Sequence, residues 1–159
     1  MNHQQNYPRN VYLIFLLSSL IGIFGGLSYA TEELILALGS SQVGLNTIGN
    51  TGGAYSLASL SNHDLNGTPC LGYGDPQPDR ILQLKSDFEH LTFEVNSNGQ
   101  DTTLVIKSLE TGVVRCGFGK NNSRDALISD RNWSAGTYHI WVGSMAPNRR
   151  SPYRLSVRP

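Results

Sequence analysis

The residue types that could perform hydrolysis are histidines, serines and carboxylates spread along the chain. A serine hydrolase needs all three brought together. Beyond the N-terminal segment, the candidate histidines are His63, His90 and His139. No serine lies in a G-x-S-x-G motif, and His63 lies among turn-forming residues. No spacing selects a carboxylate pair for glycoside cleavage from the candidates, which are Asp75, Asp79, Asp87, Glu89 and Glu94. The sequence therefore predicts a protein that is not an enzyme.

Side chains with oxygen ligands could hold a calcium ion instead. Calcium takes about six to eight oxygen ligands, usually several carboxylates together with carbonyl groups from a tight loop. The candidates, in expected loops or at expected strand ends, are Asp75, Asp79, Asp101, Asn121, Asn122 and Asp125. No D-x-D-x-D-G array is present, and Asp and Asn also nucleate turns through their own side chains. The pattern favours turn formation, and calcium is the one candidate cofactor.

The two tryptophans could stack on a sugar ring or an aromatic partner, because an indole offers a large contact area with few torsions to freeze. The segment GTYHIWVGS at 136–144 is typical of a strand, and its expected inward residues are Tyr138, Ile140 and Val142. His139 and Trp141 then face the other side. Trp141 is there either exposed or covered by another segment, such as the glycine-rich N-terminal part. Trp133, expected in the loop before this strand, is a further candidate binding residue.

Several other segments have the residue pattern of strands, and apolar and polar residues alternate with a period of two most regularly at 90–96 and 152–158. The segments with a strand pattern are 79–85, 90–96, 101–107, 111–118 and 152–158. Short strands separated by Gly, Asn, Asp and Pro are typical of an antiparallel sandwich or barrel. Residues 55–60 fit one more strand, whereas 31–39 fit either a helix or a strand. We therefore expect an all-β fold.

The N-terminal segment has the organisation of a secretory signal peptide. Arg9 precedes the apolar stretch 11–21, and Ser28-Tyr29-Ala30 supplies the small residues of a cleavage site after Ala30. The alternative is a membrane anchor, but the apolar or small stretch 11–27 is short for a span of about 20 residues. We expect a signal peptide at 1–30, a flexible or partly ordered segment at 31–50 and a single domain at 51–159. The mature protein would be secreted or periplasmic, with no stable membrane span.

The cysteines Cys70 and Cys116 are the only two in the chain. In an oxidising compartment, a cysteine pair in a small domain usually forms a disulfide. The chain has no C-x-x-C motif, and no histidine lies close to either cysteine in sequence. We therefore predict a Cys70–Cys116 disulfide.

The net charge argues against nucleic acid as a partner. The sequence contains 12 basic and 12 acidic residues, whereas binding to a phosphate backbone needs a concentrated basic surface. The densest basic cluster consists of Arg149, Arg150, Arg154 and Arg158. We interpret this cluster as a solvated edge.

The strand and loop motifs resemble the bacterial pre-peptidase C-terminal (PPC-like) β-sandwich domains. The resemblance extends over most of residues 66–157, and its most specific parts are DTTL at 101–104 and GTYHIWVGS at 136–144. Those domains are jelly-roll-like modules of secreted and surface proteins, often attached to proteases. The resemblance therefore implies a non-catalytic module. Family members often carry an aspartate-rich loop after the second cysteine, whereas this chain has CGFGKNN there.

The sequence thus predicts an exported, disulfide-bonded, jelly-roll-like antiparallel β-sandwich that binds a protein or a carbohydrate in the envelope or outside the cell. The candidate binding residues are His139, Trp141 and Trp133. One alternative is a calcium-stabilised structural protein of the envelope. Another is a secreted hydrolase or inhibitor with an unrecognised site.

Overall fold

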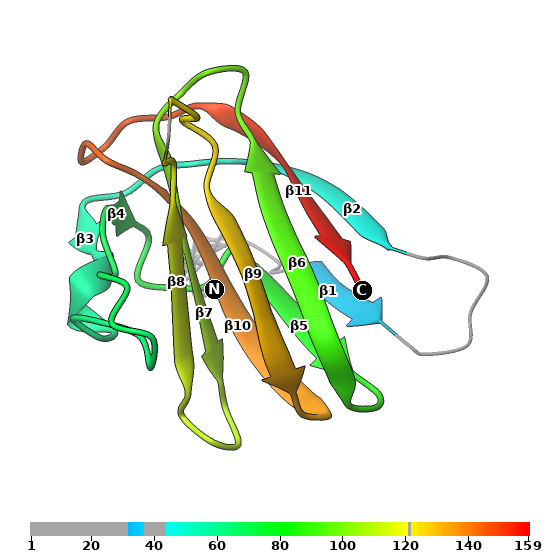
Figure 1. Ribbon diagram of the computed structural model, residues 1–159. Helices are drawn as coiled ribbons and strands as arrows, with labels where there is room; N and C mark the ends of the chain where they lie inside the picture. Colours follow the sequence, from blue (N-terminus) through cyan, green and yellow to red (C-terminus); the bar gives the residue numbers. More distant parts are fainter. Residues whose placement is uncertain (1–31, 37–43, 121) are drawn as a thin grey trace, which may run out of the picture.

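Two β-sheets pack face to face to form the protein (Figure 1). The computed structural model describes residues 32–36, 44–120 and 122–159, so the expected signal peptide and Asn121 lie outside the described residues. Sheet A contains β1 (Glu32–Leu36), β3 (Tyr55–Ser56), β4 (Tyr73–Gly74), β5 (Arg80–Leu84), β7 (Thr102–Ser108), β8 (Val114–Phe118) and β10 (Gly136–Ser144). Sheet B contains β2 (Leu45–Asn50), β6 (Phe88–Asn96), β9 (Leu127–Trp133) and β11 (Pro152–Arg158). A short 3-10 helix, η1 (Leu57–Ser59), follows β3.

The strands pair in an antiparallel manner, except that β1 lies parallel to β5. In sheet A, β10 pairs with β7 along one edge and with β5 and β4 along the other. In sheet B, β11 lies between β2 and β6, and β6 also pairs with β9. The predicted antiparallel sandwich is confirmed. The segment 31–50, expected to be flexible or partly ordered, contributes β1 and β2 to the two sheets.

The main core lies between the sheets and follows the predicted alternation. The inward residues Leu91, Phe93 and Val95 of β6 and Tyr153, Leu155 and Val157 of β11 are all buried. They pack against the inward residues of β10, which are Tyr138, Ile140 and Val142. Full burial of such a side chain contributes roughly 1.5–3 kcal/mol. The alternation in these strands therefore identifies the faces that hold the sandwich together.

A second, smaller core covers the outer face of sheet A. It contains Leu57, Cys70, Val105, Val114, Cys116 and Trp141, with Tyr55 and Leu60 packed against it. Trp141 is only 4% exposed. The segment 55–60, expected to be one strand, is instead β3 followed by η1. Because this segment packs over Trp141, the covered alternative for Trp141 is confirmed.

The structure differs from the sequence prediction at β9. Trp133 is the last residue of this strand and not part of a loop. Only Ile128 and Trp133 are buried in β9, so the strand lacks the regular alternation that marks its neighbours. No helix in the described part of the chain is both long and apolar enough to cross a membrane.

Candidate functional site

Trp133 contributes to the core and offers no stacking surface. Its side chain is 1% exposed, and its ring centroid lies 4.8 Å from that of Phe93 and 5.5 Å from that of Tyr138. The indole Nε1 donates a hydrogen bond to the carbonyl oxygen of Asp130 at 3.0 Å. With its ring enclosed and its only donor satisfied, Trp133 has a structural role.

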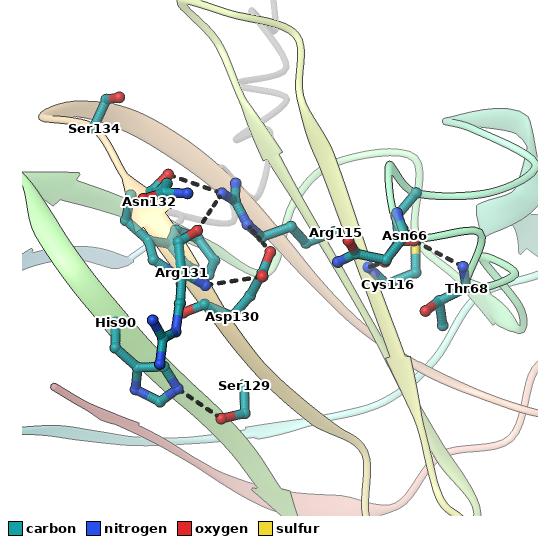
Figure 2. Close-up of polar contacts among 12 residues, drawn as sticks. Asn66, Thr68, His90, Arg115, Cys116, Ser129, Asp130, Arg131, Asn132 and Ser134 are labelled. Atoms are coloured by element: carbon teal, nitrogen blue, oxygen red, sulfur yellow. Dashed lines mark hydrogen bonds and ion pairs between the residues drawn. The ribbon is translucent and has the colours of Figure 1, made fainter.

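Arg115 closes the side of the sandwich beside Trp133. Its guanidinium carbon lies 4.0 Å from the centre of the Trp133 ring, and its Nε donates to Asp130 at 2.8 Å. The same guanidinium donates to the carbonyl oxygens of Arg131 and Asn132, as Figure 2 shows. These contacts join β8 of sheet A to β9 of sheet B. They use most of the hydrogen-bond donors of Arg115, so this side chain has a structural role.

His139 and Trp141 do not form an open binding face. Their ring centroids lie 5.8 Å apart in an edge-on arrangement. Burial lowers the pKa of His139, and the charge of Lys107 lowers it further. The Nε1 of Trp141 has no hydrogen-bond partner among the described residues. A ligand approaching this strand would therefore meet the half-buried imidazole and not the indole face.

The candidate calcium ligands are engaged in separate local contacts. Asp79 accepts a hydrogen bond from the backbone N–H of Val142 at 2.8 Å, and burial raises its pKa to about 6. Asp125 accepts hydrogen bonds from the backbone N–H and the hydroxyl of Ser97 at 2.9 and 2.8 Å. Both carboxylates accept hydrogen bonds from residues distant in sequence, so they join separate segments of the fold.

The remaining calcium candidates lie at exposed positions or outside the described residues. Asp101 forms an exposed ion pair of 3.7 Å with Arg124. Asp75 is exposed, and Asn122 has a positive φ of 66°, which asparagine tolerates in turns. Asn121 lies outside the described residues. Within the described ranges, no group of three or more histidine, cysteine, aspartate or glutamate residues could hold a metal ion.

Of the histidines considered for catalysis, His90 lies in β6 of sheet B, His139 lies in β10 of sheet A, and His63 lies in the loop before β4. His90 shares a hydrogen bond of 2.9 Å with the hydroxyl of Ser129 on the outer face of sheet B, which Figure 2 shows. That hydroxyl also lies 3.3 Å from Thr92 Oγ1. No carboxylate of the described residues forms an ion pair with His90. The pair thus lacks the acidic residue that orients a catalytic histidine.

Sequence reasoning recognised a turn region around His63 but did not single out the loop 61–70, which we call the disulfide loop, as a candidate site. Its last residue, Cys70, is bonded to Cys116 of β8. The carboxylate of Asp64 accepts hydrogen bonds from the backbone N–H groups of Asn66 at 2.9 Å, Thr68 at 2.8 Å and Cys116 at 3.2 Å. One side chain therefore shapes the loop and also attaches it to β8. The signal in the sequence is an aspartate followed by turn-forming residues and a cysteine.

Backbone hydrogen bonds close the disulfide loop further. Cys70 N–H donates to Asn62 O at 3.0 Å, and Asp64 N–H donates to Thr68 O at 2.9 Å. The tip carries Leu65, whose side chain is 81% exposed. A depression of about 280 Å³ lies between this loop and residues 111–114. The loop therefore exposes the apolar side chain of Leu65 to solvent, while several of its backbone N–H groups are already hydrogen-bonded.

A larger groove, of about 460 Å³, lies on sheet B, and we call it the outer groove. It is lined by Ile48, Gly49, Asn50, Asn96, Asn98, Pro152, Tyr153 and Arg154. These residues come from β2, β11, the end of β6 and the turn that follows it, and the three strands lie side by side in Figure 1. Carboxamides dominate the polar part of this lining.

Comparisons with known proteins give structural neighbours only. No protein-family model matches the chain, and no curated protein matches it. One similar solved structure is the pre-peptidase C-terminal domain of a collagenase from Bacillus anthracis, with 15% identity, a TM-score of 0.46 and coverage of 81% of this chain and 97% of that chain. Another is PliG of Aeromonas hydrophila, a periplasmic inhibitor of g-type lysozyme, with 10% identity, a TM-score of 0.41 and coverage of 81% and 98%. The first is a domain of the kind that the sequence resembles.

Proposed function

We propose that this protein is an exported, non-enzymatic module that binds a protein partner through its disulfide loop. The observation that carries the proposal is Leu65, an apolar side chain 81% exposed at the tip of a loop fixed by a disulfide and by Asp64. A large apolar side chain held in solvent costs free energy in the isolated protein. A concave site on a partner would remove that cost.

A rigid loop binds a partner at a lower cost in conformational entropy than a flexible loop does. Ordering a loop on binding costs about 0.5–1.5 kcal/mol for each immobilised side chain, and a loop already fixed avoids much of that cost. The Asp64 contacts and the Cys70–Cys116 bond fix the backbone on both sides of Leu65. The loop is therefore suited to insertion into a cleft, as an inhibitor or an adaptor would require.

Export is supported by the disulfide together with the expected signal peptide. Disulfides persist in oxidising compartments and are rare in the reducing cytosol, and both cysteines of this chain are paired. The non-enzymatic part is supported by the lack of a G-x-S-x-G motif and of an ion pair between His90 and a carboxylate among the described residues. Partner binding would then take place in the periplasm or outside the cell.

Substitution of Leu65 by aspartate should reduce partner capture at least about tenfold, as expected for an anchor residue of an interface. The measurement is crosslinking and quantitative mass spectrometry with exported proteins of the source organism. The matched control is Leu127→Asp, because Leu127 is 51% exposed on β9 and lies outside the disulfide loop. Equal capture by wild type and Leu65→Asp would contradict the proposal, and so would equal losses in both variants.

A further inference from the structure

The outer groove combines residues that the strand register brings into one row. Arg154 of β11 lies opposite Ile48 of β2 and opposite Asn96 of β6. The next row places Asn50 opposite Pro152. Tyr153 is buried on the inner side of the sheet, so its neighbours Pro152 and Arg154 project to the outer side. The groove thus presents one guanidinium, several carboxamides and two apolar side chains on a single face.

The backbone around the groove is held by hydrogen bonds. Thr51 Oγ1 donates to Arg149 O at 2.9 Å and accepts from Ser151 N–H at 3.0 Å, which joins the ends of β2 and β11. On the other side, Ser97 Oγ lies 2.6 Å from Gln100 O, and Asn98 has a positive φ of 53°. The carboxamide of Asn98 therefore stands on a closed turn, and the lining is largely preformed, as small-molecule sites usually are.

The charge of Arg154 is uncompensated among the described residues. Arg158, four residues further along β11 on the same face, donates to Glu94 at 2.7 Å, whereas no acidic residue of the described part of the chain pairs with Arg154. A guanidinium matches a carboxylate in geometry and can bind it through two parallel hydrogen bonds. The groove therefore favours a ligand that carries an acidic group.

The carboxamides add hydrogen-bond donors to this positive charge. Asn96 Oδ1 accepts from the backbone N–H of Asn98 at 3.3 Å, so the free end of the Asn96 side chain is its NH₂ group. Asn50 and Asn98 are exposed at the rim and can donate or accept. A ligand rich in oxygen acceptors, with hydroxyl groups beside a carboxylate, would satisfy this set.

The apolar part of the groove lining favours an acidic sugar over other acidic ligands. Ile48 is 69% exposed, and Pro152 is also exposed in the same groove. A pyranose ring presents apolar C–H groups on its faces and hydroxyl groups on its edge, which matches an apolar surface bordered by carboxamides. We propose that the outer groove binds a uronic acid unit of an acidic polysaccharide, with its carboxylate on Arg154. This site is distinct from the disulfide loop and does not depend on the function proposed for that loop.

Calorimetric titration of the full mature protein with trigalacturonate at low salt tests this proposal. We expect saturable binding that weakens about tenfold in Arg154→Gln, because a charge-assisted hydrogen bond is lost. The matched control is Arg158→Gln, which removes the same charge from the same strand and should change the affinity by less than about twofold, since Arg158 is paired with Glu94. The variant Leu65→Asp should bind trigalacturonate as wild type does, which separates this site from the proposed partner loop.

Two comparison ligands test whether the groove recognises the carboxylate, the sugar ring or both. Neutral maltotriose should bind much more weakly than trigalacturonate, and equal affinity would overturn the role of Arg154. Triglutamate carries the same number of side-chain carboxylates without sugar rings, and equal affinity for it would overturn the assignment to a sugar. Absence of binding, or NMR shifts on titration that bypass the side-chain amides of Asn50, Asn96 and Asn98, would overturn the site itself.

Discussion

Replacement of both Cys70 and Cys116 by serine is expected to lower the free energy of unfolding by about 4 kcal/mol. The bond closes a loop with a sequence separation of 46 residues, and the chain-entropy model assigns about that value to a loop of this size. Because domains of this kind are stable by only about 5–15 kcal/mol, the loss would be a large part of the total. Urea denaturation of the oxidised wild type and the double variant measures it.

The double serine variant needs a control, because the two cysteines also contribute apolar contacts to the second core. Both cysteines pack in the second core with Trp141, so the serines also remove apolar contacts. Wild type reduced with dithiothreitol keeps the sulfur atoms and loses only the crosslink. Similar destabilisation of reduced wild type and the double variant would assign the effect to the crosslink. A loss below about 1 kcal/mol in both would show that the Asp64 contacts and the apolar cluster hold the loop by themselves.

Alternation in the sequence predicted the main core because burial on one side of a strand imposes a period of two on residue type. The inward sets of β6, β10 and β11 were all found this way, and all are buried between the sheets. β9 was missed because its apolar residue Leu127 is exposed and its buried residues, Ile128 and Trp133, are five positions apart, so apolar type does not follow burial with a period of two. Trp133 closes the core from the end of that strand, which local sequence does not reveal.

The candidate site was harder to predict because it depends on contacts between distant segments. Trp141 lies on the outer side of sheet A, and only the three-dimensional path of residues 55–60 shows that it is covered. The disulfide loop was recognised as a turn region, but the bond from Cys116 N–H to Asp64 joins residues 52 positions apart. The outer groove similarly needs the β2–β11–β6 register. The disulfide itself was predicted, since two cysteines allow only one intramolecular pairing.

The Asp79 carboxyl group makes stability depend on pH. Burial raises its pKa from 3.8 to about 6, and this effect exceeds the opposing effects of the Val142 hydrogen bond and the Arg80 charge. The folded protein therefore holds the proton more tightly than the unfolded chain. The contribution of Asp79 to stability is complete below about pH 4 and is lost as the pH rises through about 6. At neutral pH the loss amounts to at most about 3 kcal/mol.

The variant Asp79→Asn is consequently expected to be more stable than wild type at pH 7.5, by up to about 3 kcal/mol. A carboxamide oxygen can still accept the hydrogen bond from Val142 N–H, which Asp79 accepts at 2.8 Å, but it carries no charge to desolvate. Urea denaturation between pH 4 and 7.5 should show a flatter profile than for wild type. The control is Glu89→Gln, which makes the same change in net charge at a side chain that is 86% exposed and should leave the profile unchanged. Lower stability of Asp79→Asn at pH 7.5 would mean that the ionised carboxylate is bound favourably, with the Val142 and Arg80 interactions outweighing burial.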